Sequence, residues 1–197
     1  GTQEGLLELN YDRDKFTLYE YDPENSQSIS FYATTSICKE DNISLWIGTW
    51  NGLNLFNKST KKFSRIYHNN KVITSLSHNS IASVFRERSG TLWVSTYGGG
   101  VNKVNRTTYP FKQYSEQTWR ESKRFSSASI MNMSTARDGS IWLATPTGLL
   151  NFNPYQEIFQ NYKITQNIRS VKEDKKGNLW IGINNSSGRG LIKFEKN

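Results

Sequence analysis

The side chains best suited to acid–base or metal chemistry are few in this sequence. Two histidines, His68 and His78, lie ten residues apart, and Cys38 is the only cysteine. A hydrolase or lyase requires an acid and a base poised in one cleft, and a metal site requires several ligands at short spacings. The histidines form no such pattern with carboxylates or with Cys38. The sequence therefore predicts no catalytic residue, no metal site and no cofactor.

A different chemistry, the recognition of sugars, is suggested by an aromatic and basic stretch at residues 115–127. Trp119 and Arg120 are followed closely there by Lys123 and Arg124. An aromatic ring offers a flat face to a sugar ring, and guanidinium groups pair well with carboxylate or sulfate groups. A solvated loop whose tryptophan covers a neighbouring element, or a dimer contact, is the alternative explanation of the same residues.

The net charge of +8 comes from 25 basic and 17 acidic residues and would attract an anionic partner. The basic residues are nevertheless scattered in pairs such as Lys61-Lys62 and Lys175-Lys176. No run of Lys and Arg interleaves with aromatic residues, as nucleic-acid platforms require. We therefore expect no nucleic-acid partner. Dispersed charge that keeps the protein soluble is the preferred interpretation, and an anionic oligosaccharide stays open.

These candidates must be positioned by a repeat that runs along most of the chain. A tryptophan after an aliphatic residue recurs at intervals of 38 to 49 residues, a period typical of repeat architectures. Each copy has a small residue two positions after its tryptophan, and most copies have a glycine, a phenylalanine and a tyrosine at fixed later positions. The four tryptophans are Trp46, Trp93, Trp142 and Trp180.

The sequence pattern of each copy predicts four short strands. In the third copy, the runs at 80–86, 91–97, 101–105 and 111–114 are rich in Val, Ile, Thr and aromatic residues and are separated by turn residues. No window holds a helical stripe of apolar residues. One four-stranded antiparallel sheet per 40–50 residues is the β-propeller blade. We predict an all-β chain with one β-propeller domain of about four blades over 1–197, with copies at approximately 1–47, 48–94, 95–143, 144–181 and an incomplete 182–197.

The repeated aromatic residues are expected to form the core between blades, because burial of large aromatic rings dominates core energetics. This prediction covers the four tryptophans and four outer-strand phenylalanines, which are Phe16, Phe63, Phe111 and Phe159. No apolar run is long enough to cross a membrane. A third-strand segment occurs at both 6–9 and 191–194, so we expect a piece of a larger propeller of the seven-bladed type.

The consensus resembles a known family. Ser-Leu-Ser-His-Asn-Ser-Ile at 75–81, Ser-Gly-Thr-Leu-Trp-Val-Ser-Thr at 89–96 and Gly-Gly-Val-Asn at 99–102 are similar to the two-component regulator propeller repeat. Residues 45–56 and 173–182 have the same pattern. The resemblance implies the periplasmic sensor region of a hybrid two-component histidine kinase, which detects oligosaccharides from complex glycans and dimerises. It also implies that the kinase and the membrane helix lie in a downstream region, so this segment would not be an enzyme.

Two other functions stay open. One is a scaffold for protein partners, which would show no sugar-induced melting shift. The other, less favoured, is a glycan lyase or glycosidase. A sialidase would carry the motif Ser-x-Asp-x-Gly-x-Thr-Trp, but Asp138 and Gly139 are adjacent in the nearest stretch.

Alternating strand directions place the turn between the second and third strands of every copy on one face. The connections between copies emerge on the same face, so we expect the ligand-binding residues to gather there. The predicted residues are Trp50, Asn51, Tyr97, Trp119, Arg120, Lys123, Arg124, Asn184 and Arg189.

Overall fold

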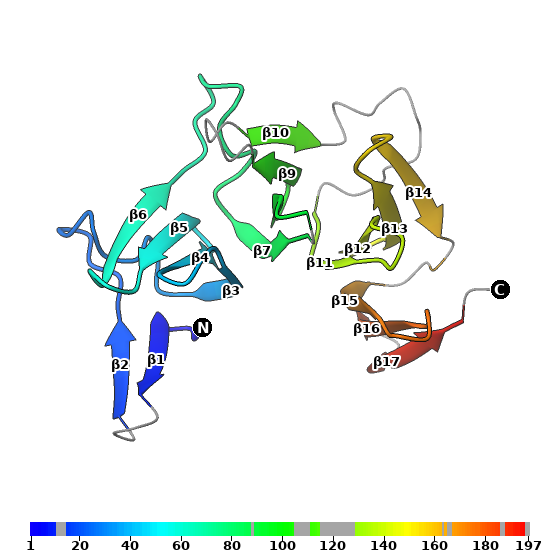
Figure 1. The fold of residues 1–197 in the computed structure, drawn as a ribbon, viewed down its shortest axis with the longest axis horizontal. Coiled ribbons are helices and arrows are strands. Elements are labelled where there is room, and N and C mark those ends of the chain that lie inside the picture. Colours follow the sequence, from blue (N-terminus) through cyan, green and yellow to red (C-terminus); the bar gives the residue numbers. More distant parts are fainter. Residues whose placement is uncertain are drawn as a thin grey trace.

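The computed structural model describes residues 1–10, 15–87, 89–104, 111–114, 129–162, 164, 167–185 and 188–195. All regular elements in these residues are strands, and they include no helix that could span a membrane. The strands form five antiparallel sheets that follow one another around an open arc (Figure 1). This confirms the predicted all-β fold built from four-stranded propeller blades, and the sheets do not close into a ring.

Each sheet is a meander of strands that are consecutive in sequence. The first sheet pairs β1 (Leu6–Asn10) with β2 (Lys15–Tyr19). Three four-stranded sheets follow. The second sheet contains β3 (Thr34–Lys39), β4 (Ser44–Thr49), β5 (Gly52–Asn57) and β6 (Lys62–Ile66), and the third contains β7 (Ile81–Arg86), β8 (Leu92–Thr96), β9 (Gly100–Val104) and β10 (Phe111–Tyr114). The fourth contains β11 (Asn132–Thr135), β12 (Ile141–Thr145), β13 (Gly148–Asn153) and β14 (Ile158–Tyr162). The fifth sheet contains β15 (Ile168–Glu173), β16 (Leu179–Asn185) and β17 (Gly188–Phe194).

The sequence copies and the sheets are offset by two strands. Each copy starts near the end of a second strand, so a sheet draws its first two strands from one copy and its last two from the next. The copy 48–94, for example, holds β5 and β6 of one sheet and β7 and the first part of β8 of the following one. Because each copy contributes strands to two sheets, the polypeptide backbone links neighbouring sheets. The copy boundaries stay a prediction.

Neighbouring sheets pack through their aromatic residues. The first strands β3, β7, β11 and β15 are in contact in that order. Trp46 is 2% exposed and packs in one cluster with Ile81 and Val84 of the following sheet. A Cβ atom at Gly48 would lie 2.6 Å from Cγ2 of Ile81, so any side chain there requires Ile81 to shift. Trp93 and Trp142 are fully buried, which confirms their predicted place in the core.

The prediction of burial is wrong for two of the eight aromatic residues. Trp180 is 38% exposed and Phe16 is 63% exposed. Phe16 belongs to the first sheet and Trp180 to the fifth. In the described chain, each of these two sheets has a neighbouring sheet on one side only. Their counterparts Phe63, Phe111 and Phe159 are buried because they have a neighbour on both sides.

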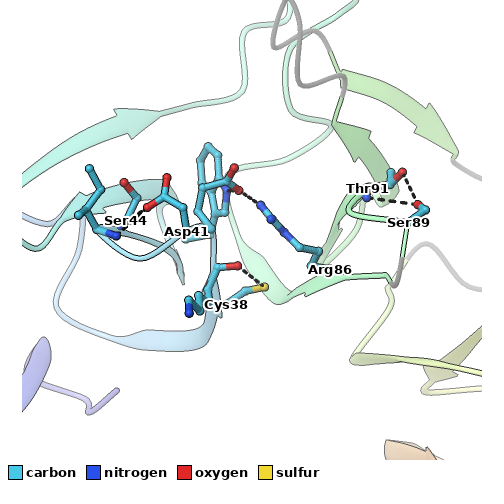
Figure 2. Close-up of polar contacts among 10 residues, drawn as sticks. Cys38, Asp41, Ser44, Arg86, Ser89 and Thr91 are labelled. Atoms are coloured by element: carbon cyan, nitrogen blue, oxygen red, sulfur yellow. Dashed lines mark hydrogen bonds and ion pairs between the residues drawn. The ribbon is translucent and has the colours of Figure 1, made fainter.

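A polar contact also joins the second and third sheets, at the face where the turn between β3 and β4 lies. Arg86 at the end of β7 reaches across to the carboxylate of Glu40 (Figure 2). The same carboxylate accepts a hydrogen bond of 2.6 Å from the indole nitrogen of Trp46. Burial raises the pKa of the nearby Cys38 thiol, which favours its protonated form.

Candidate ligand-binding site

A cleft of about 680 Å³ opens between the first and second sheets. Its volume lies within the range of about 300–1,000 Å³ that small-molecule sites occupy. The cleft lies where the turn that precedes β1 meets the turn between β4 and β5. Its lining residues are Gln3, Phe31, Tyr32, Ala33, Thr34, Trp50 and Asn51.

Trp50 is the most prominent aromatic residue of the cleft. It lies in the turn between β4 and β5, is 55% exposed and stacks on Tyr97, with ring centroids 5.5 Å apart and an interplanar angle of 21°. Tyr97 occupies the same turn position in the next sheet. The stacking fixes the orientation of the Trp50 ring while leaving more than half of the side chain accessible.

The turn that carries Trp50 has the same internal hydrogen bond in four sheets. A threonine hydroxyl donates to the carbonyl of a glycine three or four residues later, at 2.8 to 3.2 Å. The residue after this threonine differs from sheet to sheet and is Gln3, Trp50, Tyr97 or Pro146. The threonine and glycine therefore build the turn, and the residue after the threonine is free to suit a ligand.

A second pair of aromatic residues forms another wall of the cleft. Phe31 and Tyr32 stack with centroids 4.0 Å apart, and Tyr32 is 52% exposed. Tyr21 lies beside Phe31 with a centroid distance of 6.4 Å, and the Arg65 guanidinium lies 5.5 Å from the Tyr21 ring. These rings come from the connection between β2 and β3, so the cleft combines a turn with a connection, as predicted for this face.

A buried polar cluster holds the connection in place. The amide of Asn54 accepts a hydrogen bond from the backbone N–H of Ser30 at 2.9 Å and donates to the Ser30 hydroxyl at 2.8 Å. It also donates to the carbonyl of Ile47 at 3.3 Å. Asn54 is fully buried and Ser30 is 1% exposed. Because Ser30 immediately precedes Phe31, Asn54 positions the second wall of the cleft.

The same cluster recurs one sheet further along the arc. Asn102 bonds with the backbone N–H and the hydroxyl of Ser77 at 2.9 and 2.8 Å. Here the connection continues into Asn79, whose carbonyl accepts a hydrogen bond of 2.7 Å from the backbone of Gly52. The two connections are therefore anchored by one repeated device, and the second one supports the turn that carries Trp50.

Arg65 of β6 forms hydrogen bonds with an earlier part of the connection between β2 and β3. Its guanidinium donates to the backbone carbonyl of Asn25 at 2.7 Å and to that of Ser28 at 2.9 Å. Gln113 of β10 makes the equivalent contact with the carbonyl of Ser75 at 3.0 Å. The connection that bears Tyr21, Phe31 and Tyr32 is thus fixed by hydrogen bonds at several points along its length.

The polar side chains of the cleft are neutral. The side-chain amides of Gln3 and Asn51 form no hydrogen bond with other described residues, and both residues are exposed. The Thr34 hydroxyl is instead occupied, since it donates to the carbonyls of Thr2 and Gly5 at 3.0 and 3.1 Å. Amides both donate and accept, which suits sugar hydroxyl groups. In the described part of the chain, His, Cys, Asp and Glu form no group of three that could hold a metal ion.

The predicted site residues divide into three sets. Trp50, Asn51 and Tyr97 come together at the cleft, two of them as lining residues. Asn184 and Arg189 are cross-strand partners in the hairpin of β16 and β17, in a sheet further along the arc (Figure 1). Trp119, Arg120, Lys123 and Arg124 lie outside the described residues. Ligand binding by all of these residues stays a prediction.

Five cleft residues were missed by sequence reasoning, although the copies carried a signal for three of them. Gln3 has the same position in its turn as Trp50. Phe31 and Tyr32 follow the anchoring Ser30 where His78 and Asn79 follow Ser77, so an aromatic pair replaces polar residues. Comparison of the copies at the positions after each anchor would have identified these residues. Ala33 directly precedes β3 and Thr34 begins it, and neither residue carried such a signal.

The model of the two component regulator propeller family matches residues 75–98 and 163–185. The chain carries two component regulator propeller repeats. The first match contains the Ser77 anchor, β7, β8 and the turn at Tyr97. The second contains β15 and β16. Each match thus covers the first two strands of one sheet, and the first match also covers the turn at Tyr97. No curated protein sequence matches the chain.

Solved structures show the same fold at low sequence identity. One is described as the extracellular domain of a hybrid two component system from B. thetaiotaomicron; it is 23% identical, with a TM-score of 0.76 over 100% of this chain and 26% of its own. The WD40 β-propeller domain of Doa1 is 10% identical, with a TM-score of 0.65 over 87% of this chain and 53% of its own. An auxiliary nutrient binding protein from Bacteroides thetaiotaomicron is 6% identical, with a TM-score of 0.56 over 77% and 36%. The chain thus spans about a quarter of the first of these proteins.

Proposed function

We propose that this chain is part of the ligand-binding propeller of an extracytoplasmic, periplasmic sensor in a hybrid two-component system, and that it binds oligosaccharides. The repeats are those of two component regulator propellers, and the fold is that of an extracellular domain in such a system. The parent protein would carry a kinase and a membrane anchor in other regions and would signal as a homodimer.

The observation that carries this proposal is the Trp50 ring, which is held by Tyr97 at the edge of a cleft and is 55% exposed. An aromatic ring that is held in a fixed orientation at the edge of a cleft, with more than half of its surface accessible, is suited to pack against a ligand. One face of a pyranose ring presents C–H groups, which pack against the negative face of an aromatic ring. The free amides of Gln3 and Asn51 supply partners for sugar hydroxyl groups.

Binding without catalysis is the second part of the proposal. The described lining of the cleft holds amide, hydroxyl and aromatic side chains, none of which supplies the paired acid and base that glycoside cleavage requires. A scaffold for protein partners is the alternative function. It differs in a measurable way, because it requires no stabilisation of the protein by sugars.

The test is binding of a panel of oligosaccharides, measured by thermal shift and then by calorimetry on the purified protein. We expect one or more to raise the melting temperature, and Trp50→Ala to weaken binding at least about tenfold, which is 1.4 kcal/mol. Tyr155→Ala is the matched control, since Tyr155 is 77% exposed in the turn between β13 and β14, on the opposite face. Equal effects of the two substitutions, or no shift with any glycan, would contradict the proposal.

A further inference from the structure

We infer that the cleft selects an uncharged oligosaccharide several sugar units long, which lies along a track of aromatic rings from Tyr21 to Tyr97. This inference rests on the proposed function and narrows its ligand. It departs from the expectation based on net charge, which left an anionic glycan open. Two features of the described structure carry it: the aromatic rings on both sides of the cleft and the absence of charge from the cleft lining.

The aromatic track extends beyond the cleft at both ends. Tyr21 lies beside Phe31, Phe31 stacks on Tyr32, and the cleft separates this group from Trp50 and Tyr97. Tyr21 and Tyr32 are 37% and 52% exposed. A single sugar covers one ring face, whereas this arrangement offers faces from two blades. Only a ligand with several sugar units can contact both ends of the track at once.

The cleft lining contains no charged side chain among the described residues. Burying a carboxylate or sulfate without a cationic partner is costly, so an anionic sugar gains nothing there. Among the described residues, Arg65 is a cation beside the track, but its guanidinium faces Tyr21 and donates to backbone carbonyls and to the Ser28 hydroxyl. Those contacts hold the connection and leave Arg65 as a poor partner for a ligand anion.

The track is also preorganised, which favours binding of an extended and flexible ligand. A bridge between Tyr21 and Ile29 closes the connection on itself, and the Asn54 amide and the Arg65 guanidinium hold it against the sheet. A rigid site avoids the entropic cost of ordering its own side chains and loops on binding. Little of the favourable free energy of each added sugar contact is then offset by ordering of the protein, so longer ligands should bind more tightly.

The first experiment measures affinity against chain length with neutral oligosaccharides of one linkage, from the disaccharide upward. We expect affinity to rise about tenfold or more before it levels off, which is at least 1.4 kcal/mol. Tyr21→Ala should remove this gain for long ligands and leave the disaccharide unaffected, whereas Trp50→Ala should weaken both. Tyr21→Phe retains the ring and should restore the gain. A flat chain-length profile, or equal losses for short and long ligands in Tyr21→Ala, would overturn the inference.

The second experiment compares each neutral oligosaccharide with its uronic-acid or sulfated counterpart at low and high salt. We expect the neutral form to bind more tightly, with an affinity that salt leaves unchanged, because no ion pair forms that salt could screen. Tighter, salt-sensitive binding of the anionic form would overturn the inference and leave the sensor function intact. Binding of no oligosaccharide at all would overturn both.

Discussion

Replacement of Asn54 by leucine tests how the fold positions the cleft. The fourth sheet carries Leu150 at the position equivalent to Asn54, so a leucine fits the strand itself. What the substitution removes is a set of three hydrogen bonds, to the N–H and hydroxyl of Ser30 and to the carbonyl of Ile47. The backbone N–H of Ser30, in a residue that is 1% exposed, then lacks its partner.

The magnitude follows from these contacts. A net contribution of about 1 kcal/mol for each of three hydrogen bonds, with the buried N–H left unpaired, gives a loss of about 2–4 kcal/mol in the free energy of unfolding. Asn102→Leu removes the equivalent hydrogen bonds to Ser77 and Val94, so it should cost a similar amount. Urea unfolding of both variants measures these values. A loss below about 0.5 kcal/mol for Asn54→Leu would refute the assignment of this amide as an anchor.

The same variant links the anchor to binding. Once Ser30 is released, Phe31 and Tyr32 lose their fixed place, so Asn54→Leu should weaken oligosaccharide binding under conditions where the protein stays folded. Leu150→Ala is the control, because it opens a cavity in the core between the third and fourth sheets and should cost about 2–5 kcal/mol without touching the cleft. If the two variants bind ligand equally well, the cleft wall does not depend on Asn54.

Two further predictions concern single contacts, and a third concerns two residues outside the described part of the chain. Gly48→Val should lower the free energy of unfolding by about 1–3 kcal/mol through overpacking against Ile81. Gly48→Ala should lower the free energy of unfolding by less, because Ala144 and Ser95 occupy this position in other sheets. Chemical denaturation measures both values. Hydrogen bonds from Lys112 and Tyr114 hold the pKa of Glu157 below its ordinary value of 4.5, so the stability that this carboxylate contributes is complete above that pH and declines as the pH falls below it. Glu157→Gln should therefore flatten the acid limb of a stability–pH profile, and an unchanged limb would argue against the contact. Trp119→Ala and Arg120→Ala should weaken ligand binding in calorimetry of the intact sensor, and unchanged affinity would exclude the stretch 115–127 from the site.

The blades were predictable because the same physical demands recur in every copy. A tryptophan such as Trp93 must fill the space between two sheets, and Gly48 must let the next sheet approach. Both demands leave a mark at a fixed period. The exposure of Trp180 and Phe16 could not be predicted in the same way, because their residue types are those of the buried copies. What differs is whether a second neighbouring sheet covers the residue, and the periodicity of the sequence carries no information on that.

The cleft was harder to predict because it belongs to the parts of the copies that differ. Trp50 and Tyr97 could be assigned to one face from strand direction alone, and the structure stacks them. Phe31 and Tyr32 became part of the same surface only through the hydrogen bonds that fold the connection back over the sheet. Those bonds join residues more than twenty positions apart, a pairing that no local pattern reveals.

Within one chain, the copies thus separate the demands of folding from those of binding. The threonine before each variable turn residue bonds to the same backbone carbonyl in four sheets, at Thr2, Thr49, Thr96 and Thr145. The turn therefore keeps its shape whichever residue follows, and the following residue can change at little cost in stability. A blade turn of this kind is suited to acquire new specificity by substitution at one position. The free amide of Gln3 and the exposed ring of Trp50 are two results of that freedom, and they line the same cleft.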